Sequence, residues 1–147
     1  MSKAKLSYSE LLDAFEFVSA SAPMDNRAFI DRGNGKIHYL ASELDFEEKI
    51  PDDLESSNRY VEVPHKYDLD LGRNFILSFI QQELPDEYET VSEFFRRKGA
   101  YRRFKDFLDS RNQLERWYEY QSRETEKALR LWCDENGLEL TDNSSTP

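Results

Sequence analysis

The sequence contains a single cysteine, Cys133, among its 147 residues. One cysteine cannot form an intramolecular disulfide, and no second cysteine or histidine stands at the spacing that a zinc site around it would need. No other metal-ligand pattern is present, so we expect no metal site and no cofactor. A chain that does without disulfides suits a reducing compartment, and we expect a cytoplasmic location.

Long apolar runs are also missing. The first five residues are basic, but serine, glutamate and aspartate follow where a signal peptide would have its apolar core. No stretch approaches the roughly 20 apolar residues of a membrane-spanning helix. The sequence therefore predicts no membrane partner.

Motifs of known catalytic chemistry are absent from the sequence. It has no glycine-rich phosphate loop, no nucleophile elbow and no paired-carboxylate motif. Its two histidines, His38 and His65, are isolated and form neither a metal-ligand pattern nor a catalytic triad. Cys133 has no adjacent base or cation to activate it, which favours a packing role. We assign no catalytic residue, and an enzyme of unknown reaction with a pocket at His38 or His65 is the alternative hypothesis.

Aromatic and charged residues, by contrast, are abundant. Aromatic residues make up 14% of the chain and hydrophobic residues 38%, which is too much for a disordered protein even with 34% charged residues. Thirty acids against twenty bases give a net charge of −10, which disfavours binding of nucleic acid by the surface as a whole. The length suits one domain, which we place at residues 1–140, with residues 141–147 as a frayed tail.

The N-terminal half predicts one helix and a small antiparallel sheet. Ser7 with Glu10 matches a capping box at the start of a helix over residues 8–19. β-prone runs at residues 27–31 and 36–40 flank two glycines and an asparagine, which tolerate the positive φ of a hairpin turn. A third run, Arg-Tyr-Val-Glu-Val, is stopped by a proline and completes the predicted sheet.

The C-terminal half predicts helices, because its apolar residues recur at about 3.6 positions. Thr90 with Glu93 matches a second capping box and predicts a short helix that ends at Gly99. A long helix is predicted over residues 113–136, with Tyr120 off its main stripe as the candidate for an exposed aromatic. The predicted inner face carries Leu114, Trp117, Tyr118, Gln121, Ala128, Leu129 and Trp132.

The densest charged feature is the segment at residues 96–105, which has six positive charges in ten residues and no acid. Arginine and lysine neutralise phosphates, a tyrosine can stack on a base, and a glycine at a helix start lets backbone amides approach an anion. One interpretation is therefore a site for phosphate or nucleic acid. Its candidate binding residues are Arg96, Arg97, Lys98, Tyr101, Arg102, Arg103 and Lys105.

Two other interpretations of this segment remain open. Residues 43–55 carry seven acids and one lysine, so their net charge of −6 matches the six cations and the two segments could form an intramolecular clamp. Surface pairs of this kind contribute little and are screened by salt. Tyr101, Phe104 and Leu108 would then serve as core at helical spacing. Alternatively, the segment docks an acidic protein partner, because arginine makes bidentate contacts with carboxylates.

Several motifs resemble those of a bacterial family. They are Leu11-Leu12-Asp13-Ala14-Phe15-Glu16, the turn at residues 33–35, Arg59-Tyr60-Val61-Glu62-Val63-Pro64, Gly99-Ala100-Tyr101-Arg102-Arg103-Phe104-Lys105-Asp106, Trp117-Tyr118-Glu119-Tyr120, and Ala128 with Trp132 before Glu135-Asn136-Gly137. Over most of the chain they resemble uncharacterised protein family number one hundred and fifty-eight. The resemblance implies a bacterial cytoplasmic protein and a basic segment shared by the family, and it supplies no catalytic residues. The family pattern has an aliphatic residue at the position of Cys133.

These observations predict an α+β fold in which a small antiparallel sheet of about three strands packs against a largely helical C-terminal half. The leading functional hypothesis is a non-enzymatic binding or regulatory protein whose basic segment contacts an anionic partner. An acidic protein is favoured over nucleic acid as that partner. The sequence does not indicate an oligomeric state.

Overall fold

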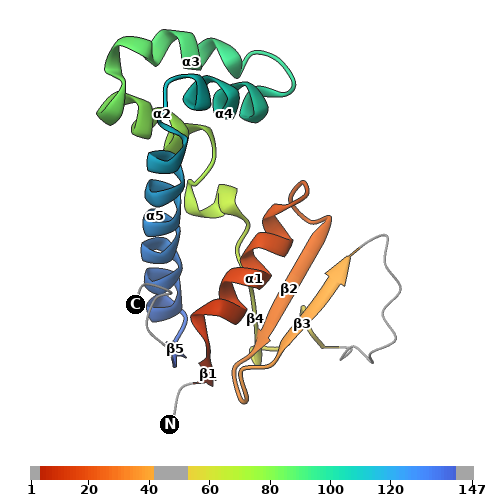
Figure 1. The fold of residues 1–147 in the computed structure, drawn as a ribbon. Helices are drawn as coiled ribbons and strands as arrows, with labels where there is room; N and C mark the ends of the chain where they lie inside the picture. Colours follow the sequence, from red (N-terminus) through yellow and green to blue (C-terminus); the bar gives the residue numbers. More distant parts are fainter. Residues whose placement is uncertain (1–3, 42–52, 142–147) are drawn as a thin grey trace. The chain divides into compact units, whose positions relative to one another are not determined.

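The computed structural model describes residues 4–41 and 53–141 (Figure 1). The chain forms two compact units. Unit 1 comprises residues 1–69 and 128–147, and unit 2 comprises residues 70–127. The single domain expected over residues 1–140 stays a prediction, and all of the expected tail except Thr141 lies outside the described residues.

The sheet of unit 1 has three antiparallel strands among the described residues, β2 (Asn26–Asp31), β3 (Ile37–Ala41) and β4 (Tyr60–Glu62), in the order β3-β2-β4. Phe29 on the central strand lies opposite His38 on one side and Glu62 on the other. This sheet confirms the sequence prediction, and each strand end falls within one residue of the predicted one.

A tight turn joins β2 to β3. Gly35 has φ 77°, and a Cβ at this position would overlap the carbonyl oxygen of Lys5. The buried carboxylate of Asp31 accepts a hydrogen bond of 2.7 Å from the Gly33 amide and pairs with the Arg59 guanidinium at 2.9 Å. Burial by itself would raise the pKa of this carboxyl, but these hydrogen bonds outweigh burial and lower it. Asp31 therefore fixes the turn through its contacts with Gly33 inside the turn and with Arg59 next to β4.

Helix α1 (Tyr8–Ser19) packs against β2 and has the predicted bounds (Figure 1). The Ser7 side chain accepts a hydrogen bond of 3.0 Å from the Glu10 amide, as the capping box predicts. The Ser7 hydroxyl also donates to the Glu10 carboxylate at 3.2 Å. The buried face of the helix consists of Tyr8, Leu11, Ala14, Phe15 and Val18.

A second, two-stranded sheet of unit 1 was not predicted. Strands β1 (Ala4–Leu6) and β5 (Leu138–Leu140) pair in parallel, and Leu6 and Leu138 are buried. Each strand has only three residues, which is too short for an alternating pattern, and the partners come from opposite ends of the described chain. A strand pairing that depends on so distant a partner cannot be predicted from the local sequence.

Unit 2 is helical throughout its regular structure. It contains α2 (Arg73–Glu83), a 3-10 turn (Pro85–Glu87), α3 (Tyr88–Phe94), α4 (Ala100–Ser110) and the first part of α5 (Leu114–Glu135), which ends in unit 1. With the sheet of unit 1, these helices confirm the α+β class. The core of unit 2 consists of Phe75, Ile76, Leu77, Phe79, Ile80, Val91, Phe104, Leu108 and Trp117.

The predicted start of α3 is wrong. The helix begins at Tyr88 rather than after Thr90, because the preceding 3-10 turn opens with Pro85, whose fixed φ suits the first position of a helical turn. The helix also ends at Phe94, short of Gly99, which instead is the N-cap of α4.

The inner face of α5 differs from the predicted one at two tyrosines. Tyr120 stacks on Phe75 with ring centroids 5.0 Å apart, whereas Tyr118 is 41% exposed. Trp117 is buried, and a neighbour one position along a helix is rotated about 100° away, whereas a residue three positions along returns to the same face. The helix therefore buries position 120 and exposes position 118. No helix among the described residues is long and apolar enough to span a membrane.

Candidate functional site

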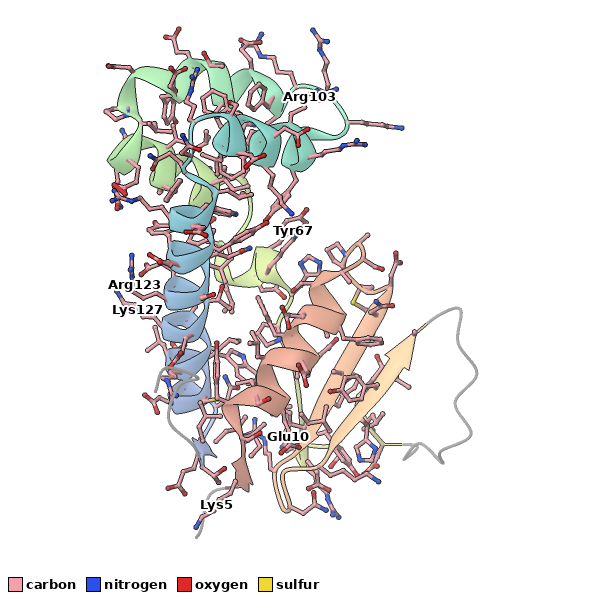
Figure 2. All side chains as sticks on the ribbon, viewed as in Figure 1. Lys5, Glu10, Tyr67, Arg103, Arg123 and Lys127 are labelled. Atoms are coloured by element: carbon pink, nitrogen blue, oxygen red, sulfur yellow. The ribbon has the colours of Figure 1, made fainter. Side chains whose placement is uncertain are left out.

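We define the basic corner as residues 96–105. It comprises the end of the connection between α3 and α4 and the first part of α4, all within unit 2. Three of its cations follow the end of α3, and the other three lie in the first two turns of α4. Figure 2 shows Arg103 at this connection. The fold thus gathers all six cations of the segment around one turn and one helix start.

Gly99 occupies the N-cap position of α4 with φ 78°. A Cβ added there would meet nothing within 4 Å, so the glycine is needed for its backbone conformation and not for space. No side chain caps this helix start. The amides of the first turn therefore lack a side-chain acceptor, and they add their partial positive charge to that of the cations.

Two of the cations contact neighbouring groups. The Arg96 guanidinium lies 3.4 Å from the Glu93 carboxylate, and both side chains are mostly exposed. Arg103 donates a hydrogen bond of 2.7 Å to the backbone carbonyl of Lys98, which ties α4 back onto the connecting turn. The first contact is a weak surface pair, whereas the second joins the connecting turn to the first turn of α4.

The side chains of Arg97, Lys98 and Arg102 are exposed, and no ion pair or hydrogen bond joins them to any other residue that the structure describes. Two other surface arginines of unit 2 are paired: Arg111 lies 3.2 Å from Glu87, and Arg116 lies 2.7 Å from Glu83. The basic corner is thus a part of this unit where the described acids leave cations uncompensated.

Two tyrosines adjoin Lys105, another cation of the basic corner. The Lys105 ammonium lies 5.6 Å from the ring centroid of Tyr101 and 5.6 Å from that of Tyr118. The two residues are 37% and 41% exposed. Trp117, which is buried, donates a hydrogen bond of 3.4 Å to the Tyr101 hydroxyl. Sequence reasoning selected Tyr101 but assigned Tyr118 to the inner face of α5, so it missed that two rings share one lysine.

A rigid aromatic core supports the corner from beneath. Phe104 and Leu108 are fully buried, and the Phe104 ring meets Trp117 edge to face with centroids 5.0 Å apart. On the other side of the turn, Phe94 meets Phe107 at 5.7 Å. Of the predicted stripe, Phe104 and Leu108 are core, whereas Tyr101 is partly exposed at the surface.

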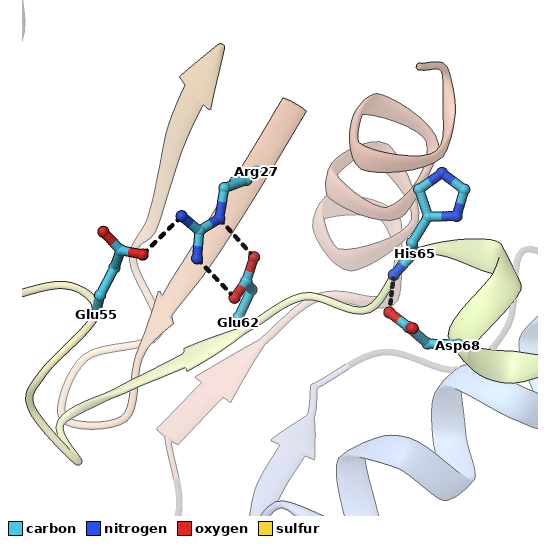
Figure 3. Close-up of polar contacts among 5 residues, drawn as sticks. All are labelled: Arg27, Glu55, Glu62, His65 and Asp68. Carbon is cyan, nitrogen blue, oxygen red and sulfur yellow. Dashed lines mark hydrogen bonds and ion pairs between the residues drawn. The ribbon is translucent and has the colours of Figure 1, made fainter. Parts of the chain in front are cut away.

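The negative charge of the chain is concentrated in unit 1. Unit 2 carries 12 acids and 11 bases, a net charge of −1, and unit 1 carries 18 acids and 9 bases, a net charge of −9. Most of the acidic segment proposed as a clamp, residues 43–52, lies outside the described residues. Glu55 at its end is bound to Arg27 of its own unit at 2.7 Å, as Figure 3 shows.

Both ring nitrogens of His65 are engaged within unit 1. Nδ1 accepts a hydrogen bond of 3.1 Å from the Tyr67 amide, so Nε2 must carry the proton that it shares with the Ser21 carbonyl at 2.8 Å. The His65 amide donates to Asp68 at 3.0 Å (Figure 3). These bonds connect residues 65–68 to Ser21, which is a structural role.

His38 is 7% exposed on β3 and meets the Tyr60 ring edge to face with centroids 5.8 Å apart. Neither His38 nor His65 lines the pocket of about 550 Å³ found in unit 1, which is formed by Arg130, Cys133, Asp134, Leu138, Glu139 and Leu140. Burial raises the pKa of the Cys133 thiol to about 11, so the thiol is protonated at neutral pH. In the described ranges, no three histidine, cysteine or acidic side chains form a metal-binding group.

Comparison with known proteins identifies the chain at the level of its family. No curated protein and no solved structure matches it. A family model matches residues 4–145, which include both units and the whole basic corner. The chain therefore belongs to the Uncharacterised protein family (UPF0158), as its motifs indicate.

Proposed function

We propose that this protein is a non-enzymatic binding or regulatory protein of the bacterial cytoplasm that contacts an anionic partner through the basic corner. The observation that carries the proposal is the set of three exposed cations, Arg97, Lys98 and Arg102, which have no partner among the described residues. They lie around the start of α4, where no side chain caps the helix. An anion at this point would meet both the cations and the amides of the first turn.

Without a bound anion, the basic corner is electrostatically unfavourable. The N-terminus of a helix carries a partial positive charge, and a cation there is destabilising by a few tenths of a kcal/mol or more. Arg102 and Arg103 lie in this first turn. A bound anion would remove the repulsion, so the arrangement favours a partner over an empty surface.

The distribution of charge supports the same proposal. The six cations of the basic corner bring unit 2, whose other residues carry a net charge of −7, to a net charge of −1, so the positive charge of this unit is concentrated at the corner. At physiological salt, charges further away than about 8 Å are largely screened. The net charge of −10 therefore opposes binding less than its size implies.

The alternative, an enzyme that uses His38 or His65, has less support. A general base needs a nitrogen that can reach a substrate proton. His65 uses both ring nitrogens within the fold, and His38 is buried against Tyr60.

Charge reversal within the corner tests the proposal. The variant combines Arg97→Glu with Arg102→Glu and is compared with wild type on immobilised heparin, a polyanion that mimics neither protein nor base. We expect at least about tenfold weaker binding and elution at lower salt, because two ionic contacts become repulsive. If the heparin column does not retain the wild-type protein, the proposal is wrong.

The matched control combines Arg123→Glu with Lys127→Glu, which changes the net charge by the same amount. Figure 2 shows both side chains on α5, away from the basic corner in sequence. If heparin binding depends only on net charge, the two double variants will weaken equally, and the corner is then not the site. We expect the control to retain most of the binding.

A further inference from the structure

We propose that the anionic partner is a single-stranded nucleic acid, with its phosphates at the cations of the basic corner and its bases stacked on Tyr101 and Tyr118. This inference rests on the proposed function and names the partner of the same site. The juxtaposition that carries it is a pair of partly exposed tyrosine rings that share Lys105, in the same corner as three cations that have no partner among the described residues.

The two rings are close enough to serve one strand. Because each centroid lies 5.6 Å from the same Lys105 ammonium, the centroids are about 11 Å apart at most. Adjacent or next-nearest nucleotides of a flexible strand can span such a distance. Lys105 lies close to both rings, so a strand that reached both would pass near a positive charge.

Tyr101 is held in place before any ligand arrives. Its hydroxyl accepts the Trp117 hydrogen bond, and its ring meets Phe104 edge to face with centroids 6.3 Å apart. Phe104 and Trp117 are both buried. A ring held in this way loses little conformational entropy when a base stacks on it.

Cations flank the Tyr101 ring along the corner. Arg97 and Lys98 precede Tyr101, Arg102 follows it, and Lys105 lies one helical turn further on. A nucleic acid strand likewise carries a phosphate next to each base. Proteins that bind single strands combine a positively charged surface with stacking aromatics, and the combination tolerates any sequence because every base has a flat face.

An acidic peptide fits the site less completely. Its carboxylates could pair with the guanidinium groups, but aspartate and glutamate side chains have no flat ring to cover the exposed tyrosines. A duplex also fits less well, because its bases are already stacked on each other and present only their edges. The single strand is the partner whose two kinds of group match both kinds of side chain.

The test measures the fluorescence anisotropy of dye-labelled 12-nucleotide oligothymidylate with the full chain, at 50 and 200 mM NaCl. We expect Tyr101→Ala and Tyr118→Ala each to weaken binding about 5- to 150-fold, which is the range that loss of one stacked base produces. Tyr101→Phe and Tyr118→Phe should retain binding, because the ring remains. Three phosphate contacts would give a slope of about −2 in log affinity against log salt.

Tyr88→Ala is the matched control. Tyr88 is 37% exposed and begins α3, at the other end of that helix from the basic corner. This variant should bind as wild type does. Circular dichroism of all variants identifies any loss of fold, and Tyr118→Ala keeps the test open if Tyr101→Ala disturbs Trp117. An oligouridylate of equal length shows whether the strand is RNA or DNA.

Three other outcomes would overturn the inference in distinguishable ways. Oligonucleotide binding that both alanine variants leave unchanged, or equal binding of a duplex, would mean contacts to the backbone alone. Binding of labelled polyglutamate but not of the oligonucleotide, lost with Arg97→Glu and Arg102→Glu, would identify an acidic protein partner and leave the proposed function standing. Failure to bind the oligonucleotide, polyglutamate and heparin alike would remove both proposals.

Discussion

Cys133 is 2% exposed on α5, and burial raises the pKa of its thiol to about 11. At pH 8 only about 0.1% of such a thiol is ionised, against roughly a quarter of a free thiol with a pKa near 8.5. We therefore expect a disulfide reagent to modify the native protein at least a hundredfold more slowly than the urea-unfolded chain. The absorbance of the released reagent thiol measures both rates.

The dependence of this reaction on pH provides its control. The thiolate fraction rises with pH, so the native rate should keep increasing up to about pH 11, whereas the rate for the unfolded chain should level off above about pH 9. Rapid modification of the native protein at pH 8 would show an accessible thiolate and would reopen a catalytic role for Cys133.

At the same scale, local reasoning found the residue types of the candidate site but not their orientation. The sequence indicated all six cations and Tyr101, because charge density and helical spacing are local properties. It placed Tyr118 on the wrong face, since the stripe was drawn through both Trp117 and its neighbour. The sequence also could not show which cations lack partners, because acids such as Glu87 and Glu83 reach their arginines only in the folded unit.

At the scale of elements, Gly35 is where the β2–β3 turn meets β1. Its φ of 77° is unfavourable for other residues, and a Cβ would overlap the Lys5 carbonyl oxygen. We expect Gly35→Ala to lower the free energy of unfolding by about 2 kcal/mol or more, since conformational strain and a backbone clash add together. Urea unfolding followed by circular dichroism measures the change.

Gly137→Ala is the matched control for this prediction. Gly137 lies in the same unit with φ 70°, but a Cβ there meets nothing within 4 Å. In this variant the free energy of unfolding should fall only by the cost of a positive φ for alanine, about 1–2 kcal/mol. If both variants are destabilised equally, the contact with Lys5 contributes nothing and β1 is not positioned by the turn.

The elements that the sequence predicted correctly are those with local signals. The capping box at Ser7, the two glycines of the hairpin turn and the apolar spacing of α5 each act within a few residues. The strands β1 and β5 have no such signal, because each depends on a partner at the other end of the described chain. The start of α3 was misplaced because Pro85 opened the helical turn earlier than the capping motif implied.

At the scale of the whole molecule, the separation of charge allows a test of the clamp between the basic corner and the acidic segment 43–55. Arg102 lies in the first turn of α4, where an acid would interact favourably with the helix dipole and with the nearby cations. If the corner is a site for an external anion, Arg102→Glu should raise the free energy of unfolding by about 0.3–1 kcal/mol. Thermal melting at low salt measures it.

A clamp predicts the opposite sign. Reversal of one of its cations would turn attraction to the acidic segment into repulsion and would lower the melting temperature, with a smaller effect at high salt. Arg123→Glu on α5 is the comparison, because Arg123 already lies beside an acid, Glu124, at 3.7 Å. A melting temperature that falls for Arg102→Glu and recovers in salt would favour the clamp.

The pairing of β1 with β5 also determines the order in which the protein can be completed during synthesis. Unit 1 is interrupted in sequence by unit 2, so β1 leaves the ribosome early and finds its partner strand only when residues 138–140 have emerged. Unit 2 is continuous and can close its core first. Unit 1, although it begins before unit 2, can therefore be completed only after unit 2 has been made.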